Sequence, residues 1–572
     1  MKLIKHTLFL IIFFSFVAIT TANAVTKGDD PIYSERNISN YFSGIISTKA
    51  NKTNKALNFF KKTTLLKSRH LNYNVQFLRT LISLEKFNEA FIYANSLSAE
   101  ESNFTEANLL IGIDAFLKKN YIKAEKYFQK LNNTDRSNFF FQDLLGNSLI
   151  AWVEASKLNE KKSFETLKKI PVRFENLKKI QEVFLACHFE LSSTDGLFKN
   201  LIENNETDFS RYNFFFTNYL LYQNNYIKAQ DIIAEGRLNS QSNLLINQTY
   251  ELLKNKKIVK IKSFFNCKAP NHVLAEFFYI IANFHSTEKD FLLSNFYLKI
   301  SLFLNNNFLS NNTLLAENYM NQKKFRLSKK IYESLKEIGE IYSWHSNTRI
   351  SYILSNIESE DKAFHYLEKE LLLLKIPNYN HYYDLANLYK DHQNHKKAVK
   401  YYSLALKKLK IGHELIPKIL DKRGTSYERM GIWLKAEEDL KKSLEILPNQ
   451  PYVLNYLAYS WIDKKINIDK SLEMLRKAND LRKNDGYIID SLGWAFYLIE
   501  DYLEAEKFLR KAVQLLPTDP IINDHYADTL WKLNKPIQAR YFWKYVLNLE
   551  RTENDLKKNI AKKLIFGVFE KS

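Results

Sequence analysis

The clearest alternation of apolar and polar positions lies between Asp485 and Pro517. In two stretches of this segment, apolar or small residues recur every three or four positions, which places them on one face of an α-helix. Pro517 follows the second stretch, and proline cannot continue a helical hydrogen-bond ladder. The segment therefore predicts two amphipathic helices joined by a short turn. Their inward-facing residues are Ile489, Leu492, Gly493, Phe496, Ala505 and Leu509.

The same pattern returns at a fixed period on both sides of this hairpin. Hairpins are predicted to begin near Pro417, Pro451, Gly486 and Pro520, at steps of 34, 35 and 34 residues. Small residues recur where two helices approach closely, and a single hairpin cannot bury its apolar face alone. The residues that mark the repeat are Gly424, Ala436, Ala458, Gly493, Ala505, Pro517, Ala527 and Ala539.

This spacing resembles the tetratricopeptide repeat (TPR) family, whose unit of about 34 residues is a helical hairpin. The resemblance implies an all-α fold, a right-handed TPR α-solenoid or superhelix. Weaker copies continue upstream, where Ala56, Ala90 and Ala124 are spaced by 34 residues. Counting steps of this length predicts about 12–15 hairpins. The amphipathic segment 554–572 is expected to form a C-terminal capping helix.

The first residues have the pattern of a secretory signal peptide. Lys2 and Lys5 precede an apolar run from Leu8 to Ile19, and Ala22-Asn23-Ala24 provides a cleavage site. The run is short for a bilayer span, so export to the periplasm with cleavage after Ala24 is favoured over a retained anchor. No Cys lies near the cleavage point, so a lipid anchor is not expected. The predicted organisation is a signal peptide (1–24), a linker (25–36), degenerate repeats (37–270), intermediate repeats (271–416), well-matched repeats (417–553) and the capping helix (554–572).

Composition supports a long helical protein. Only 13 Gly and 10 Pro occur in 572 residues, which leaves little room for the turns of an all-β fold. The formal charge of +20 becomes +18 when Lys2 and Lys5 leave with the signal peptide. Export argues against nucleic acid as a partner, and an anionic envelope surface or a plain solvated face remain the alternatives. The lysines predicted on the outer, convex face are Lys396, Lys397, Lys407, Lys408, Lys435, Lys441 and Lys442, with Lys562 and Lys563 in the capping helix.

No catalytic or metal-binding motif stands out, so no catalytic residue, metal or cofactor is predicted. The sequence Ser83-Leu84-Glu85-Lys86 fits S-x-x-K but lacks its companion motifs and falls at a predicted turn. His392 and His395 fall in a loop between helices. An enzyme site within 155–270 is the alternative of another class. Cys187 and Cys267 lie 80 residues apart, and repeats that distant along a solenoid seldom touch. Export would permit a disulfide, so their pairing stays open.

The predicted functional surface is the inner groove, which the first helices of successive TPR hairpins line. The face of these helices that hairpin packing leaves free combines aromatic side chains with amides and carboxylates. Such a surface suits an extended or helical peptide, although the aromatic residues could instead bridge adjacent repeats. The ligand is expected to be internal, apolar and neutral to basic. The predicted groove residues are Tyr452, Asn455, Tyr459, Tyr487, Asp490, Trp494, Tyr497, Asp524, Asp528 and Trp531.

The segments 454–461, 485–494 and 524–531 look like the C-terminal part of long exported bacterial TPR proteins. That group includes an outer-membrane lipoprotein that acts as adaptor for a periplasmic C-terminal processing protease. The resemblance implies a non-enzymatic scaffold that presents clients, such as cell-wall hydrolases, to a protease or cell-wall enzyme. The missing lipobox Cys departs from that pattern. A scaffold of an envelope export or polysaccharide-secretion complex is the alternative.

Overall fold

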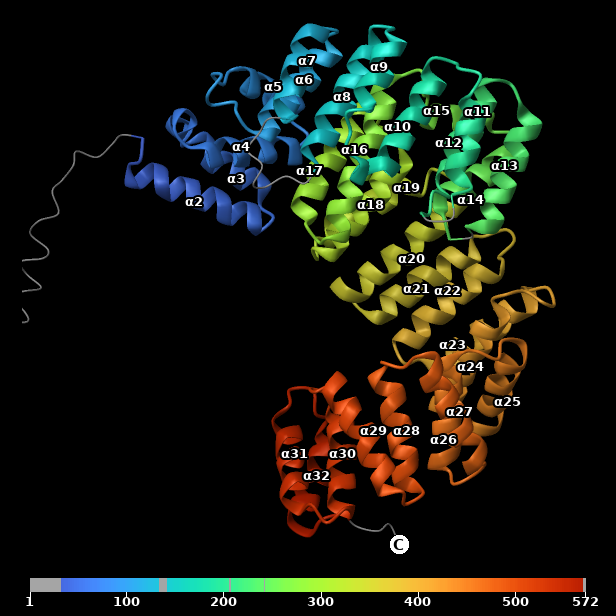
Figure 1. Ribbon diagram of the computed structural model, residues 1–572. Coiled ribbons are helices and arrows are strands. Elements are labelled where there is room, and N and C mark those ends of the chain that lie inside the picture. Colours follow the sequence, from blue (N-terminus) through green and yellow to red (C-terminus); the bar gives the residue numbers. More distant parts are fainter. Residues whose placement is uncertain (1–31, 133–140, 205–206, 241, 569–572) are drawn as a thin grey trace, which may run out of the picture. The chain divides into compact units, whose positions relative to one another are not determined.

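A computed structural model describes residues 32–132, 141–204, 207–240 and 242–568 (Figure 1). Within these ranges all regular structure is helical, as predicted for an all-α repeat protein. No helix among the described residues has both the length and the apolar character needed to cross a membrane. The predicted signal peptide (1–24) and most of the predicted linker (25–36) lie outside the described residues.

The chain divides into two compact units, an N-terminal unit up to Ile353 and a C-terminal unit from Leu354. The N-terminal unit contains α2 (Glu35–Lys49), α3 (Thr53–Lys61), η1 (Thr64–Ser68), α4 (Leu71–Ser83), α5 (Phe87–Asn95), α6 (Thr105–Leu117), α7 (Tyr121–Asn132), α8 (Gln142–Ser156), α9 (Glu160–Leu167), η2 (Val172–Phe174), α10 (Glu175–His188), α11 (Thr194–Ile202), α12 (Tyr212–Tyr222), α13 (Tyr226–Asn239), α14 (Leu244–Lys254), α15 (Ile258–Phe264), α16 (Pro270–Thr287), α17 (Phe291–Leu304), α18 (Leu309–Asn321), α19 (Phe325–Leu335) and most of α20 (Glu340–Ile357).

The C-terminal unit contains the best-matched repeats. Its helices are α21 (Glu360–Leu372), α22 (Tyr379–Asp391), α23 (His395–Lys408), α24 (Ile416–Arg429), α25 (Trp433–Ile446), α26 (Pro451–Asp463), α27 (Ile468–Leu481), α28 (Gly486–Leu498), α29 (Tyr502–Leu515), α30 (Pro520–Lys532), α31 (Pro536–Asn548) and α32 (Asn554–Phe566). Fourteen consecutive pairs in the described chain pack as hairpins, from α2/α3 to α18/α19 and from α22/α23 to α30/α31. This number agrees with the 12–15 hairpins predicted.

Small residues allow the two helices of a hairpin to pack closely, as the sequence indicated. A Cβ atom on Gly493 would lie only 2.7 Å from Cγ of Leu509 on the second helix. The marker alanines Ala436, Ala458, Ala505, Ala527 and Ala539 are fully buried. Gly493 is therefore a packing residue in the seam of its hairpin.

Nearly every hairpin turns in the same way. The residue just beyond the C-terminal end of the first helix adopts the left-handed conformation that closes a helix C-terminus. In α24/α25 this residue is Gly431, with φ 74°. In the other hairpins the residue at this position carries a side chain, and its left-handed conformation costs on the order of 1 kcal/mol. The non-glycine residues at this position are Asn51, Glu85, Lys119, Leu158, Glu190, Asn224, Lys256, Lys289, Lys323, Gln393, Lys465, Glu500 and Asn534.

The N-terminal unit folds back on itself. Helix α16 contacts α8, and helix α17 contacts α4, although α4 and α8 lie far earlier in the chain (Figure 1). The ring of Phe303 on α17 stacks on Phe87 with centroids 4.1 Å apart, and Lys299 forms an ion pair with Glu85. These contacts bury surfaces of early repeats that an open solenoid would leave free.

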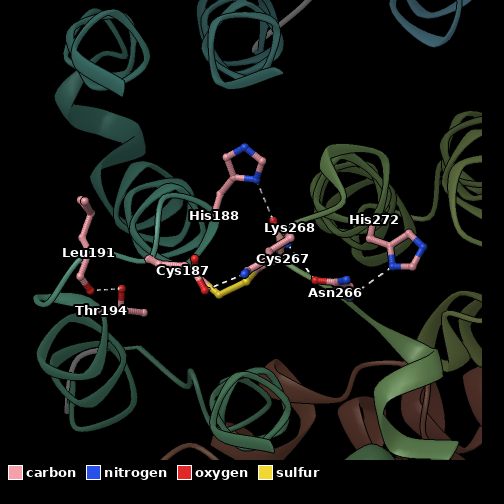
Figure 2. The surroundings of a disulfide bond; sticks show 9 residues. Cys187, His188, Leu191, Thr194, Asn266, Cys267, Lys268 and His272 are labelled. Carbon is pink, nitrogen blue, oxygen red and sulfur yellow. Dashed lines mark hydrogen bonds and ion pairs between the residues drawn. A yellow bond between two sulfur atoms is a disulfide. The ribbon is translucent and has the colours of Figure 1, made fainter. Parts of the chain in front are cut away.

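The fold-back explains a disulfide that the repeat spacing argued against. Cys187, at the end of α10, is bonded to Cys267, which lies between α15 and α16 (Figure 2). The imidazole of His188 lies beside the bridge, with Nδ1 3.2 Å from the Cys267 carbonyl oxygen. The expectation that repeats so far apart do not touch was wrong for this pair, because a 34-residue period carries no information on where the chain turns back.

Candidate partner-binding groove

The first helices of the C-terminal unit form a continuous inner face. Helix α26 packs directly on α28, and α28 packs on α30. Each second helix contacts its own first helix and the first helix of the next hairpin, as α29 contacts α28 and α30. First helices therefore touch across these repeats, and we call the face that α26, α28 and α30 share the candidate groove.

An aromatic stack crosses the middle of this groove. The ring of Trp494 on α28 lies 3.9 Å from the ring of His525 on α30, nearly parallel to it. On its own helix, Trp494 stacks on Tyr497 with centroids 4.4 Å apart. Trp494 and Tyr497 are half-buried, so Trp494 bridges adjacent repeats, which was the alternative interpretation of the aromatic strip.

Beneath the stack, an ion pair links the same two helices. Nδ1 of His525 lies 3.0 Å from Oδ1 of Asp490. Burial alone would lower the pKa of His525, but the Asp490 carboxylate, with Asp524 and Asp528 nearby, raises it overall. Asp490 is therefore paired with His525 of its own chain and is not a free carboxylate.

A second ionic cluster joins the last hairpin to the capping helix. Nζ of Lys563 on α32 lies 2.8 Å from Oδ1 of Asp524 and 2.7 Å from Oδ2 of Asp528. Asp528 also accepts a hydrogen bond from Nε1 of Trp543 at 3.0 Å. Burial, together with the neighbouring Asp524, raises the pKa of Asp528 to about 6. The prediction that Lys563 contributes to the outer basic face was wrong, because this side chain reaches inward to neutralise two buried carboxylates.

The open part of the groove lies at the first turns of the first helices. Tyr452, Tyr487 and Ile521 occupy equivalent positions on α26, α28 and α30, and 54%, 59% and 48% of their surfaces are exposed. The hydroxyl of Tyr452 donates a hydrogen bond to Asp485, the residue that caps α28. These three side chains form what we call the groove edge.

The remaining predicted groove residues are at least half-buried. Burial raises the pKa of Tyr459 to about 12. Oδ1 of Asn455 is buried without a hydrogen-bond partner in the described part of the chain. Trp531 packs near Trp543, with centroids 5.5 Å apart, and the guanidinium of Arg540 lies 4.9 Å from its ring centroid.

The structure thus divides the ten predicted residues into three groups. Asp490 and Trp494 contact His525, and Tyr497 stacks on Trp494. Asp524, Asp528 and Trp531 lie near the capping helix α32 or its C-terminal end. The third group is Tyr452, Asn455 and Tyr459 on α26 together with Tyr487 at the groove edge. The sequence analysis missed His525 and the inward role of Lys563. The repeat register did not indicate His525, because the step between these two hairpins is 34 residues, which aligns Asp490 with Asp524 and leaves His525 one position further on.

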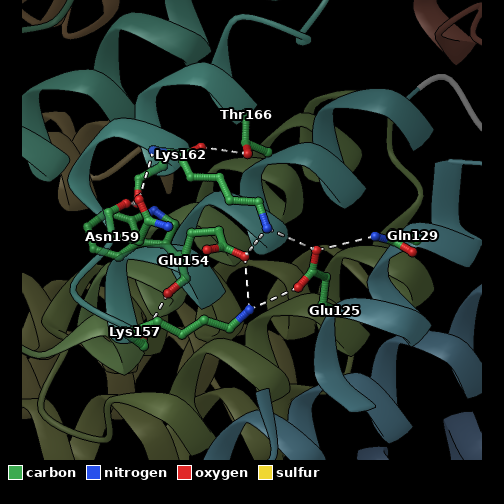
Figure 3. A network of polar contacts seen from close by, with 10 residues as sticks. Glu125, Gln129, Glu154, Lys157, Asn159, Lys162 and Thr166 are labelled. Atoms are coloured by element: carbon green, nitrogen blue, oxygen red, sulfur yellow. Dashed lines mark hydrogen bonds and ion pairs between the residues drawn. The ribbon is translucent and has the colours of Figure 1, made fainter. Parts of the chain in front are cut away.

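The stretch 155–270, considered above as an enzyme alternative, begins beside an ionic network that links α7, α8 and α9 (Figure 3). Nζ of Lys157 lies 2.9 Å from both Glu125 and Glu154, and Nζ of Lys162 lies 2.9 Å from Glu154. Burial alone would raise the pKa of Glu154, but hydrogen bonds from Lys162 and Lys157 lower it overall. Glu154 is thus a paired carboxylate within the α8/α9 hairpin, and Lys157 and Lys162 link it to Glu125 of the preceding hairpin.

The motif fragments noted in the sequence lie in turns. Ser83 ends α4, and Glu85 occupies the left-handed turn position with φ 59°. Nδ1 of His392, which follows α22, lies 2.9 Å from Glu360 on α21. The prediction that His395 lies in the same loop was wrong, because His395 is the first residue of α23. No group of three or more His, Cys, Asp or Glu residues within the described ranges is placed to hold a metal ion.

Comparison with known proteins agrees with the repeat assignment. No family model matches the chain. A curated relative from Pseudomonas aeruginosa, named "TPR repeat-containing protein PA4667", is 30% identical over 99 residues, which is 17% of this chain and 17% of the relative. The matched hairpins are similar to tetratricopeptide repeats. The chain matches less than a fifth of the length of that relative, so the match concerns repeats and not a whole protein.

Several solved TPR-like structures are similar at low identity. The Cut9–Hcn1 complex of the APC/C is 14% identical, covers 93% of this chain and 96% of that chain, and has a TM-score of 0.37. Yeast Tom70 is 14% identical, covers 92% and 94%, and has a TM-score of 0.31. TTC0263, a thermophilic TPR protein of Thermus thermophilus, is 17% identical, covers 32% and 98%, and has a TM-score of 0.29.

Proposed function

We propose that this TPR protein is a non-enzymatic scaffold that binds other proteins in the periplasm through the groove of its C-terminal unit. The predicted signal peptide supports the location. The resemblance of segments 454–461, 485–494 and 524–531 to exported adaptors supports a role in presenting clients to an envelope protease or cell-wall enzyme. In this proposal the groove of the C-terminal unit binds the partner, and the partner protease or cell-wall enzyme carries out the reaction.

The observation that carries this proposal is the exposed groove edge. Tyr452, Tyr487 and Ile521 stand at one position of three successive repeats and remain about half exposed. Aromatic and aliphatic side chains on a rigid scaffold gain binding energy when a partner removes them from water, and they lose little conformational entropy. Exposed side chains that recur at the same position of successive repeats suit a partner peptide that lies across several repeats.

The charges of the groove define which partners fit. The carboxylates of Asp490, Asp524 and Asp528 already pair with His525 and Lys563. A basic partner would therefore have to compete with cations of the chain itself. The favoured partner is an internal segment with apolar side chains that pack on the groove edge.

The test is capture of partners from a periplasmic extract by the purified full-length mature chain, followed by affinity measurement with the partner identified. Tyr487→Ala should weaken binding about tenfold or more, as expected for an interface hot spot. Tyr452→Phe should bind nearly normally, because it keeps the ring and loses only the hydroxyl that contacts Asp485.

The matched control is Tyr541→Ala. Tyr541 is 67% exposed but lies on the second helix α31, away from the inner face. Binding that survives Tyr487→Ala but is lost with Tyr541→Ala, or with Lys435→Glu, would place the working surface on the outer face. Circular dichroism should show unchanged helix content for all variants.

A further inference from the structure

Helix α2, the first helix of the described residues, carries a stripe of exposed apolar side chains. Ile38, Phe42 and Ile46 are 40%, 57% and 65% exposed. The opposite side of α2 is buried, since a Cβ atom on Gly44 would lie 2.5 Å from the ring of Phe60 on α3. A TPR array normally needs a polar outer face at its end to stay soluble, so an apolar end face indicates an occupant.

The residues of the stripe are arranged symmetrically about Phe42 along the helix. Ile38 and Ile46 lie four residues either side of Phe42, and Glu35 and Lys49 lie seven residues either side. At about 100° per residue all five fall within roughly 80° of arc, on one face of the helix. Glu35 and Lys49 are both exposed. Glu35 and Lys49 place opposite charges at the two ends of the stripe, and between them an isoleucine lies on each side of Phe42.

We propose that α2 pairs with α2 of a second copy of this chain, antiparallel, about a twofold axis that passes next to Phe42. A twofold interface brings each surface against itself in reverse. Phe42 then meets Phe42 of the second copy, and Ile38 meets Ile46. Glu35 meets Lys49 twice, once on each side of the axis.

Other occupants fit the stripe less well. A parallel pairing would set Glu35 against Glu35 and Lys49 against Lys49, which costs free energy. In a chain cleaved after Ala24, the segment that precedes the described residues is Val25-Thr-Lys-Gly-Asp-Asp-Pro31, which offers one large apolar side chain for three exposed ones. A second copy supplies the matched apolar residues together with the reversed charges.

The size of the stripe sets the strength of the dimer. Fifteen residues of helix are about 22 Å long, so this interface is smaller than the roughly 800 Å² per partner that a stable complex buries. The dimer is therefore weak and depends on concentration. It would place two C-terminal grooves in one particle, which raises the apparent affinity for a partner that has two binding segments.

A cysteine at the symmetry axis gives a direct test. The two native cysteines are bonded to each other in the structure, so Phe42→Cys adds a single thiol that should face the same thiol of the second copy. Mild oxidation should give a covalent dimer in high yield. The matched control is Ile122→Cys, at an exposed position on α7, which should stay monomeric. Equal yields from both variants, at any concentration up to several hundred micromolar, would overturn the proposal and leave the stripe to another occupant.

Charge exchange tests the antiparallel register. Sedimentation equilibrium in low salt should show Glu35→Lys and Lys49→Glu each weakening the dimer several-fold, because like charges then meet. The double variant Glu35→Lys/Lys49→Glu should return to near the parent affinity. A double variant as weak as either single one contradicts the register. Glu35 also stabilises the N-terminus of α2, so helix content must be compared across the series.

Discussion

Nδ1 of His525 on α30 lies 3.0 Å from Oδ1 of Asp490 on α28, so an ion pair joins two neighbouring repeats at the floor of the groove. The ring of Trp494 stacks on His525, with centroids 3.9 Å apart. In repeat proteins, stability is a sum of terms within repeats and between nearest neighbours. The pair therefore contributes to the interface between the two hairpins that carry most of the predicted site.

The His525–Asp490 pair should make stability depend on pH. The pKa of His525 is raised in the folded state, so this group stabilises the fold fully below its unfolded value of about 6.5. That contribution is lost as the pH rises through the folded pKa. His525→Gln removes it. Urea unfolding should show a difference between the parent and the variant that is larger at pH 6 than at pH 9. A difference that grows with pH would contradict this account.

The disulfide should stabilise the N-terminal unit. Cys187 and Cys267 close a segment with a sequence separation of 80, and native disulfides typically contribute about 2–5 kcal/mol. Cys187→Ser/Cys267→Ser should lower the stability of the N-terminal unit by that amount. Hydrogen exchange should then be faster in α10 and α15, with the C-terminal unit as internal control. Unchanged protection in α10 would mean that the fold-back contacts suffice without the bridge.

The seam of the α28/α29 hairpin has no room for a larger residue. Gly493→Leu should cost about 1–3 kcal/mol or more, because even a Cβ atom would lie 2.7 Å from Leu509. The matched control is Gly196→Ala on α11, where no atom lies within 4 Å of the new methyl group. That change should stabilise its helix by up to about 1 kcal/mol. Thermal melting separates the two outcomes, and a Gly493→Leu chain that melts like the parent would refute the packing role.

Much of the repeat architecture could be predicted from the sequence, because the packing inside a hairpin depends on local spacing. Gly493 and Ala505 mark positions where one helix touches the other, and both are buried there. The fold-back of the N-terminal unit could not be predicted in this way. Its contacts, such as Phe303 on Phe87, join residues more than 200 positions apart, and no periodic signal specifies which repeats meet.

The binding role of the groove stays a prediction, and the structure adds what each predicted side chain contacts. The repeat register placed Asp490, Trp494 and Asp528 on the inner side of their helices. It did not indicate that cations of the chain itself would neutralise the carboxylates. Lys563 appeared in a basic run of the capping helix, and only packing of α32 against α30 turns that side chain toward Asp524 and Asp528.

Removal of the Lys563 ammonium should leave two buried like charges next to each other. Lys563→Met keeps most of the side-chain volume, yet breaking such a pair typically costs about 3–5 kcal/mol. The pKa of Asp528, about 6 with Lys563 present, should rise further. Because the folded state then binds a proton more tightly than the unfolded state, the loss of stability should be largest above pH 7 and should shrink as the pH falls.

A second substitution distinguishes this electrostatic effect from lost packing. Lys563→Met/Asp528→Asn removes one of the two charges and can retain the hydrogen bond from Nε1 of Trp543 to the side-chain oxygen. Its unfolding free energy at pH 8 should lie well above that of Lys563→Met, and its pH dependence should be flatter. If the double variant is no more stable than the single one, α32 is held by its apolar residues, such as Ile560, which is fully buried, and the ionic cluster contributes little.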